Sequence, residues 1–210
     1  MRHLRRTVLA TFAIALLAAP AAAARKPQPD PRGPVVAPAG GKLLGEAWAR
    51  GLSAPIPDPY AGTCAPVARG GTVVAGHFGD DGTATCQIKR GTSVLVFWSF
   101  FCSDVFEGVS GEAAQRECAI AGDQTVQEID VTIDDGPAVA IRRPRYEALS
   151  PQRTVQLGDG SGPITFVAHG WAALIRHLRP GEHTIDVEVV DVNYEFTATL
   201  DITVTGHVHG

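Results

Sequence analysis

Residues 184–205 read TIDVEVVDVNYEFTATLDITVT, and apolar and polar side chains alternate through most of this stretch. Alternation with a period of two is typical of β-strands that bury one face and expose the other. The segment Asp191–Asn193 interrupts the pattern with residues that favour a turn. We therefore predict an antiparallel β-hairpin over these residues.

Further strands are predicted upstream. Ile129, Val131 and Ile133 alternate with polar residues in the same way, and the turn residues Asp134–Gly136 follow them. The stretch Val94–Phe101 is apolar almost throughout and has the length of a strand. Such a run suits a central strand that is covered on both faces.

A second hairpin is predicted for residues 73–78 and 83–88, because Gly79–Gly82 between them has turn composition. Thr165–Ala168 and Trp171–Leu178 are candidates for two more strands, although the second also has helical spacing.

Few segments of the sequence have the spacing of apolar residues that is typical of a helix. Lys42–Arg50 is one candidate, and Gly111–Ala121 is the better one, with Ser110 as the expected N-cap and Gly122 just past the end. Many short strands separated by Gly, Pro and Asp turns predict a mainly β fold. We expect an antiparallel β-sandwich, Ig-like or jelly-roll-like, with one or two short helices.

The beginning of the chain has the pattern of a secretory signal. Residues 1–7 carry three arginines, Val8–Ala19 is apolar, and Ala21–Ala24 are small. This order predicts a signal peptide over residues 1–24 and a secreted, extracellular or cell-envelope protein. The alternative is an uncleaved membrane anchor, but the apolar run is shorter than the about 20 residues that span a bilayer.

Composition divides the rest of the chain. Residues 25–41 hold five prolines and several glycines, a composition that predicts an extended, disordered linker. A single β-sandwich domain is expected over residues 42–210. Removing residues 1–24 takes away three arginines and no acids, so the formal charge goes from −4 to −7. Such an acidic domain is a poor nucleic-acid binder, and we expect no membrane insertion after signal cleavage.

The chain has an even number of cysteines, namely Cys64, Cys86, Cys102 and Cys118. In an exported chain this predicts disulfides, with three pairings possible. We favour Cys64–Cys86 and Cys102–Cys118, because both close short local loops. A zinc site is the rival interpretation, but the spacing contains no C-x-x-C pair.

Several segments together resemble a group of exported bacterial β-sandwich proteins with no assigned activity. The segments are Trp48, Pro57–Cys64, Cys86–Thr92, Arg145–Pro151, Gly170-Trp171 and Leu178–Ile185. The likeness covers roughly residues 42–190, and the chain departs from the group over Pro66–Gly76. The resemblance implies a fold and a compartment, and no function.

Motifs that carry catalysis are incomplete. Gly108–Gly111 and Gly160–Gly162 both miss the G-x-S-x-G spacing of a nucleophile elbow. The chain has no H-E-x-x-H, phosphate-binding or dinucleotide-binding motif. Oxidised cysteines supply no thiolate nucleophile. We therefore expect no cofactor.

Histidines and acids offer weaker candidates. His207 and His209 would share one face of a strand and could bind a metal, but a solvated terminus explains them as well, so we predict no metal site. Asp104 and Glu107 follow the central strand closely and could act as paired carboxylates on a glycosidic bond, or be a polar loop tip. His77 and His169 cannot be placed from the pattern, and His183 is expected to support the turn at Pro180-Gly181.

Aromatic and basic side chains are the remaining candidates. Trp98 lies inside the apolar run and is expected in the core. The predicted ligand-binding side chains are Trp48, Tyr146, Trp171, Arg143 and Arg145.

The sequence supports two hypotheses about function. The first is a non-enzymatic binding or interaction module whose partner is a glycan or a cell-envelope component. The second is an exported hydrolase or lyase that acts on glycans through carboxylates or histidine. A cleft that joins His77 or His169 to Asp104 or Glu107 would favour the enzyme, whereas a face bearing Trp48, Tyr146 or Trp171 would favour binding. The oligomeric state is left open.

Overall fold

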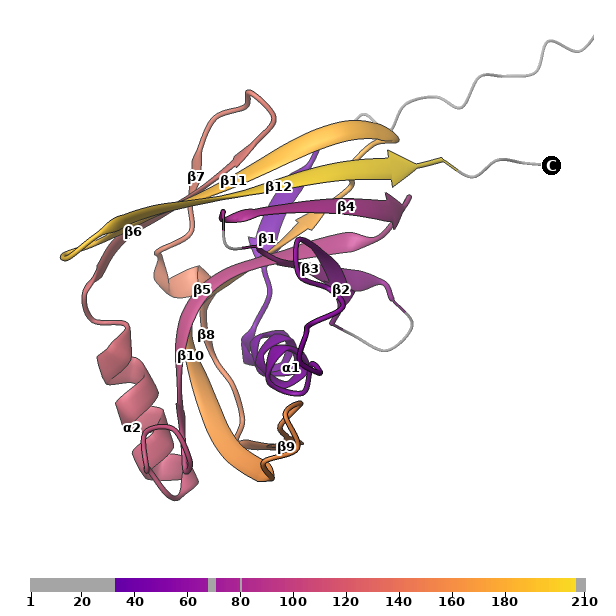
Figure 1. Cartoon of the computed structure of the whole chain (residues 1–210). Helices are drawn as coiled ribbons and strands as arrows, with labels where there is room; N and C mark the ends of the chain where they lie inside the picture. The colour runs from indigo at the N-terminus through magenta and orange to yellow at the C-terminus, as the bar shows by residue number, and fades with distance from the viewer. Residues whose placement is uncertain (1–32, 68–70, 80, 207–210) are drawn as a thin grey trace, which may run out of the picture. The chain divides into compact units, whose positions relative to one another are not determined.

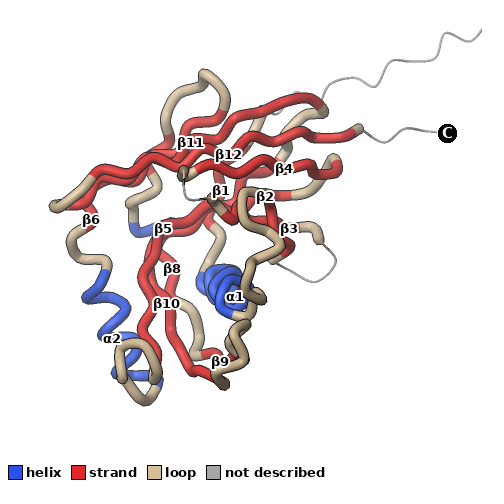
Figure 2. The backbone as a smooth tube through the Cα atoms, in the orientation of Figure 1, coloured by secondary structure: helices blue, strands red, loops and turns tan. Residues whose placement is uncertain are grey.

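The computed structural model describes residues 33–67, 71–79 and 81–206. These described residues belong to one compact unit. In this unit the strands make two sheets, and both α-helices of the described ranges pack on the first sheet (Figure 1, Figure 2). The predicted mainly β sandwich with two short helices is confirmed. The predicted signal peptide lies outside the described residues.

The first sheet is built around two long strands, β5 and β10. Its strands, in spatial order, are β1 (Val35–Pro38), β10 (Pro163–Arg176), β5 (Ser93–Ser103), β3 (Val73–His77) and β2 (Thr63–Pro66), while β8 (Glu147–Leu149) and β9 (Arg153–Gln156) also pair with β10. The apolar run therefore lies in the middle of the strand order, as predicted, although β3 pairs with it only as far as Leu95. The two candidate segments of residues 165–178 form one strand, β10, rather than two.

The second sheet contains the hairpin predicted for residues 184–205. Its strands, in order, are β4 (Thr83–Lys89), β12 (Glu195–Thr205), β11 (Gly181–Asp191), β6 (Val126–Ile133) and β7 (Val139–Ala140). β11 and β12 pair antiparallel from Gly181 opposite Val204 to Val190 opposite Glu195. The predicted hairpin is confirmed, and most other pairings are also antiparallel.

Two apolar clusters hold the layers together. The larger cluster lies between the sheets and includes Val94 and Val96 of β5, and Ile185 and Leu200 of the second sheet. The smaller lies under helix α1 (Gly41–Leu52), where Leu44 is fully buried. Because β5 and β10 bury side chains on both faces, their sequences are apolar rather than alternating.

The predicted hairpin between residues 73–78 and 83–88 is wrong. β3 pairs with β2 and β5 in the first sheet, whereas β4 pairs in parallel with β12 in the second. Gly82, with a φ of 74°, directs its carbonyl to the Thr199 N–H of β12. The connection therefore crosses between sheets, because the free edge of β12 offers β4 a partner.

The prediction of a disordered linker over residues 25–41 is wrong for residues 35–38, which form strand β1. Val35–Pro38 pairs antiparallel with Val35 opposite Arg176 in β10, and Val36 packs against the core between the sheets. Prolines are compatible with this position, because an edge strand does not need every N–H for pairing. The folded domain thus includes residues before residue 42.

Helix α2 (Glu112–Gly122) lies close to its predicted bounds. Gly111 occupies the N-cap and no side chain caps the helix, so the prediction of Ser110 as N-cap is wrong. Gly122 is the last helical residue rather than the one beyond. A Cβ on Gly122 would lie 2.3 Å from Cδ1 of Phe100, so this glycine allows α2 to approach β5 closely.

Both favoured disulfides are confirmed. Cys64–Cys86 joins β2 to β4 and so links the two sheets, with a Cα–Cα distance of 5.3 Å. Cys102–Cys118 fastens α2 to β5, with a Cα–Cα distance of 5.9 Å. Neither helix in the described ranges has the length and hydropathy needed to span a membrane.

Candidate functional site

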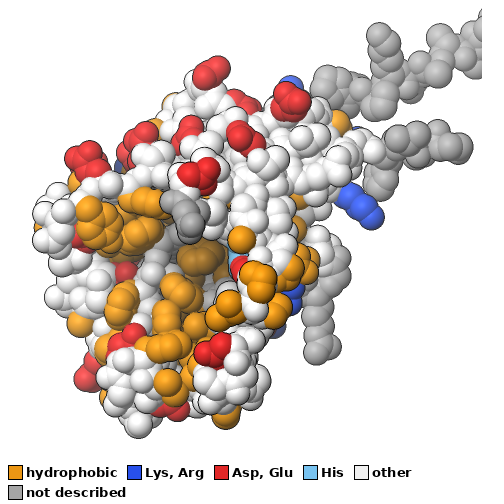
Figure 3. Space-filling view, viewed as in Figure 1, with side chains coloured by type: hydrophobic (Ala, Val, Ile, Leu, Met, Phe, Trp, Pro, Cys, Tyr) orange, Lys and Arg blue, Asp and Glu red, His pale blue; other side chains and the backbone are white. Residues whose placement is uncertain are grey.

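An apolar cleft opens between the two sheets beside β5. Its cavity measures about 350 Å³. The lining residues are Trp48 of α1, Gly76 and Phe78 at the end of β3, Leu95 to Ser99 of β5, Val187 of β11, and Phe196, Ala198 and Leu200 of β12. Figure 3 shows apolar side chains gathered in a hollow on this face.

The cleft exists because β3 leaves β5 early. The two strands pair only from Val73 opposite Ser93 to Ala75 opposite Leu95. At Gly76 the chain approaches the second sheet so closely that an added Cβ would lie 2.9 Å from Cδ1 of Leu200. β3 thus bends toward β12 and leaves space above the rest of β5.

Aromatic rings form the wall and mouth of the cleft. The Trp98 ring centroid lies 5.8 Å from that of Phe196 and 6.2 Å from that of Tyr194. Phe78 and Phe196 are 39% and 38% exposed, which is unusual for side chains of this size. Trp98 was expected in the core, but the structure places it half-buried on the cleft wall, because the sandwich opens at this point.

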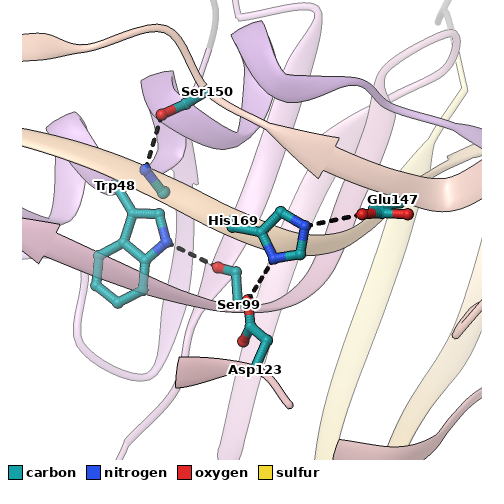
Figure 4. A network of polar contacts seen from close by, with 7 residues as sticks. Trp48, Ser99, Asp123, Glu147, Ser150 and His169 are labelled. Carbon is teal, nitrogen blue, oxygen red and sulfur yellow. Dashed lines mark hydrogen bonds and ion pairs between the residues drawn. The ribbon is translucent and has the colours of Figure 1, made fainter. Parts of the chain in front are cut away.

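Trp48 is held in position by a hydrogen bond from its ring. Its Nε1–H donates to Oγ of Ser99 at 2.8 Å (Figure 4), and the ring lies 4.5 Å, centroid to centroid, from Phe101. The bond joins α1 to β5 directly beside the cleft. Of the predicted ligand-binding residues, Trp48 is the one that lines this cavity.

A second polar cluster lies in the first sheet around His169 of β10. Its Nδ1 is 3.0 Å from Oδ2 of Asp123, just after α2, and its Nε2 is 3.0 Å from Oε1 of Glu147 on β8 (Figure 4). Asp123 and His169 are almost fully buried, whereas the Glu147 side chain is half exposed. An imidazole can donate to both carboxylates at once only when both ring nitrogens carry a proton.

The cluster shifts two pKa values in the same direction. Burial raises the pKa of Asp123 above its ordinary value, although hydrogen bonds from His169 and the Phe100 N–H oppose this. Burial lowers the pKa of His169, but its contacts with Asp123 and Glu147 outweigh burial and leave the pKa raised. The cluster therefore holds a proton more firmly than its separate groups would. Both ring nitrogens are engaged, so His169 presents no free base.

The other predicted ligand-binding residues do not gather around the cleft. Tyr146 is buried, and its hydroxyl donates to the Val36 carbonyl at 3.2 Å. Trp171 is buried near His169, with the Arg142 guanidinium 5.1 Å from its ring centroid. Arg143 and Arg145 are exposed at the short 3-10 helix η1 (Pro144–Tyr146), and neither is among the residues that line the cleft.

The candidate acids and histidines of the enzyme hypothesis lie apart. Oδ1 of Asp104 accepts the Thr165 N–H at 2.8 Å, and Oε2 of Glu107 accepts the Ser103 N–H at 2.8 Å, so both carboxylates support the loop after β5. His77 is paired with Asp58 at 2.9 Å. Of the residues that the structure describes, no Asp, Glu or His lines the cleft.

His183 supports its turn as expected, because its Nε2 lies 2.8 Å from the Arg179 carbonyl oxygen. No group of three metal-ligating side chains suited to an ion occurs within the described ranges. His207 and His209 lie outside the described residues, so the prediction about this pair stays a prediction.

Sequence reasoning missed Phe196, Ala198 and Asp123. The alternation in residues 194–205 placed Phe196 and Ala198 on the buried face of the strand. It did not show that the first sheet leaves this part of the face uncovered. A signal for Asp123 did exist, since His169 stands within an apolar strand and a buried imidazole needs polar partners.

Comparison with known proteins adds little to this geometry. No model of a known protein family matches the chain, and no curated protein matches it. Among solved structures, the chain is similar to the solution structure of amebosin, with 10% sequence identity, 63% of this chain and 96% of that chain covered, and a TM-score of 0.25. A likeness this weak supports no conclusion about the fold or function of this chain. The fold and cross-links define a disulfide-bonded, mainly β protein of the sandwich class.

Proposed function

We propose that this protein is an exported, non-enzymatic binding module that receives an apolar ligand in the cleft between its sheets. The observation that carries the proposal is the lining of the cavity, which within the described part of the chain is apolar and aromatic apart from Ser99. Ligand pockets in proteins are mostly apolar, with a few polar groups that orient the ligand. Monomeric proteins seldom leave such aromatic surface open without a use.

The compartment is part of the proposal. Disulfides persist in oxidising environments outside the cytosol, and both disulfides of this chain join separate elements of the sandwich. The signal-like residues 1–24 support the same compartment. Mass spectrometry of the secreted protein should find an N-terminus near Arg25, and recovery of intact Met1 in membranes would contradict export.

An apolar ligand fits the cleft better than the glycan expected at first. Glycans need several hydrogen-bonding partners around an aromatic platform, and the lining supplies one hydroxyl, Ser99, which already accepts the Trp48 N–H. The hydrolase or lyase alternative receives less support, because the candidate acids and histidines do not meet at the cavity.

The test uses the neutral fluorescent probe N-phenyl-1-naphthylamine. We expect its emission to rise on binding to the purified protein, with energy transfer from Trp98 at the cavity wall. Ala198→Leu fills the cavity and should weaken binding by at least roughly tenfold, because it removes the space for an apolar group.

Thr197→Leu is the matched control. Thr197 is the exposed neighbour of Ala198 on β12 and points to the opposite face. It should leave probe binding unchanged, and thermal melts should show that both variants fold. Equal losses in the two variants, or no probe binding to the unaltered protein, would refute the proposal.

A further inference from the structure

The outer edge of β5 has no neighbouring strand along most of its length. β10 accompanies β5 from Val94 to Ser103 on one side. On the other side β3 pairs only as far as Leu95. Within residues 33–67, 71–79 and 81–206, no strand continues the ladder past that point.

The hydrogen bonds at its two ends show which residues of β5 face this edge. The Ser93 N–H donates to the Thr72 carbonyl on the β3 side at 2.9 Å. At the far end, the Ser103 N–H donates to Glu107, and the Ser103 carbonyl accepts the Val109 N–H at 2.9 Å. Backbone groups of an antiparallel strand alternate between its two neighbours, so the odd-numbered residues face outward.

Phe97, Ser99 and Phe101 therefore direct their backbone N–H and C=O groups to the open edge. These groups have no hydrogen-bond partner in the part of the chain that the structure describes. An unpaired row of this kind is a template for another extended chain. Natural sheets bind peptides in this way, with main-chain bonds for affinity and pockets for alternate side chains.

Apolar surface lies on both sides of the same edge. Trp98 lies on one side, against Tyr194 and Phe196, and the cavity reaches from there around the edge to Trp48. On the other, Trp48 packs against Phe97 and Phe101. Successive side chains of a strand point to opposite faces. A strand added here would therefore bury apolar residues on both faces and extend the sandwich.

The charges beside the cleft are acidic. Exposed Asp81 lies near Phe78, exposed Glu195 precedes Phe196, and exposed Glu107 holds the end of β5. Figure 3 shows acidic side chains around the apolar hollow. Among residues 33–67, 71–79 and 81–206, no Lys or Arg lines the cavity. A partner with basic flanks is favoured, and a second copy of this acidic chain is disfavoured by like charges.

We propose that the β5 edge from Phe97 to Phe101 binds an extended polypeptide as an added strand, with apolar side chains in the cleft and basic residues beside them. This rests on the proposed function, since the same cleft receives the apolar groups. A lipid or other small apolar molecule would fill the cavity but could not pair with the row of backbone donors and acceptors.

The probe is a short synthetic peptide of alternating valine and threonine with lysines at both ends, blocked at its termini. Calorimetry should show binding that weakens as salt is added. Two further versions of the peptide carry N-methyl groups on alternate amides. Each version removes the N–H donors along one of the two edges of the extended peptide. The version that blocks the pairing edge should bind at least roughly tenfold more weakly, because it loses several hydrogen bonds.

Ser99→Pro and Ser99→Ala form a matched pair. Proline removes the outward N–H without touching the ladder to β10, and such a position tolerates proline. Alanine keeps the N–H and loses only the hydroxyl that Trp48 uses. Ser99→Pro should therefore bind the peptide at least roughly tenfold more weakly than Ser99→Ala, which measures the effect of losing the hydroxyl alone.

The outcomes separate the two proposals. If N-phenyl-1-naphthylamine binds but the peptide does not, or both methylated peptides bind as well as the parent, strand addition is refuted and the apolar cleft remains. If neither ligand binds, the proposed function fails as well. A dimer in sedimentation that Ser99→Pro dissociates would show that the edge serves a second copy, which also overturns the inference. The methylated peptides decide the matter even if Ser99→Pro fails to fold.

Discussion

Nδ1 of His169 lies 3.0 Å from Oδ2 of Asp123, and both side chains are almost completely buried. The contact joins β10 to the end of α2, in the region where the Cys102–Cys118 disulfide also holds that helix. Buried ionisable groups are tolerated when they are paired and hydrogen-bonded. This pair therefore makes the packing of α2 sensitive to pH.

We expect the stability contributed by His169 to fall as pH rises. Its pKa is raised in the folded protein, so the folded state holds the proton more firmly than the unfolded chain does. The contribution is complete below the unfolded pKa of about 6.5 and is lost as pH passes through the higher folded pKa. The raised pKa of Asp123 acts in the same direction at acidic pH.

The measurement is the free energy of unfolding against pH for the unaltered protein and His169→Gln. Their difference should shrink as pH rises above about 6.5. NMR titration of the His169 ring should give a pKa above the ordinary histidine value. A ring that titrates below that value would show that burial, rather than the carboxylates, dominates.

Gly170→Ala should destabilise the protein strongly. An added Cβ would lie 2.2 Å from the Trp98 carbonyl oxygen, and Gly170 has a φ of 157°. Because the obstacle is backbone of the neighbouring central strand, we expect a loss of about 1–3 kcal/mol or more in chemical denaturation.

Gly51→Ala is the control for that substitution. Gly51 lies in α1, and a Cβ there would meet nothing within 4 Å. Alanine should stabilise the helix by about 0.5–1 kcal/mol. Similar losses for both substitutions would mean that β5 and β10 are less tightly packed than the structure indicates.

The hydrogen bond between Trp48 and Ser99 should appear as a coupling energy. Trp48→Phe removes the donor and Ser99→Ala the acceptor, and each is expected to cost about 0.5–1.5 kcal/mol. The double variant should lose less than the sum, since the second change finds the bond already broken. Strictly additive losses in urea denaturation would contradict a bond at this position.

Removing the Cys102–Cys118 disulfide should loosen α2 selectively. Its sequence separation is 16, and closing a loop of this size is worth about 3 kcal/mol in the chain-entropy model. A variant with both cysteines changed to alanine should exchange the amide hydrogens of α2 faster. A variant with Cys64 and Cys86 changed to alanine should instead exchange the amide hydrogens of β2 and β4 faster. If both variants exchange faster only in β2 and β4, the Cys102–Cys118 disulfide does not hold α2 in the expected way.

Local patterns in the sequence predicted much of the fold. The alternation in residues 184–205 predicted β11 and β12 because burial of one face imposes a period of two. The apolar run of residues 94–101 predicted a central strand for the corresponding reason. Short loops between cysteines were enough to choose both disulfides, since nearby residues meet at the lowest entropic cost.

Apart from the hairpin of β11 and β12, the tertiary structure decided which strands became neighbours. Turn composition at Gly79–Gly82 is equally compatible with a hairpin and with a crossing between sheets, and the free edge of β12 made the difference. The cleft likewise depends on where β3 leaves β5. The pairing of His169 with Asp123 joins residues 46 positions apart in the chain. Periodicity reports the face on which a side chain lies, whereas a site depends on which faces meet, and that is determined only when the whole chain packs.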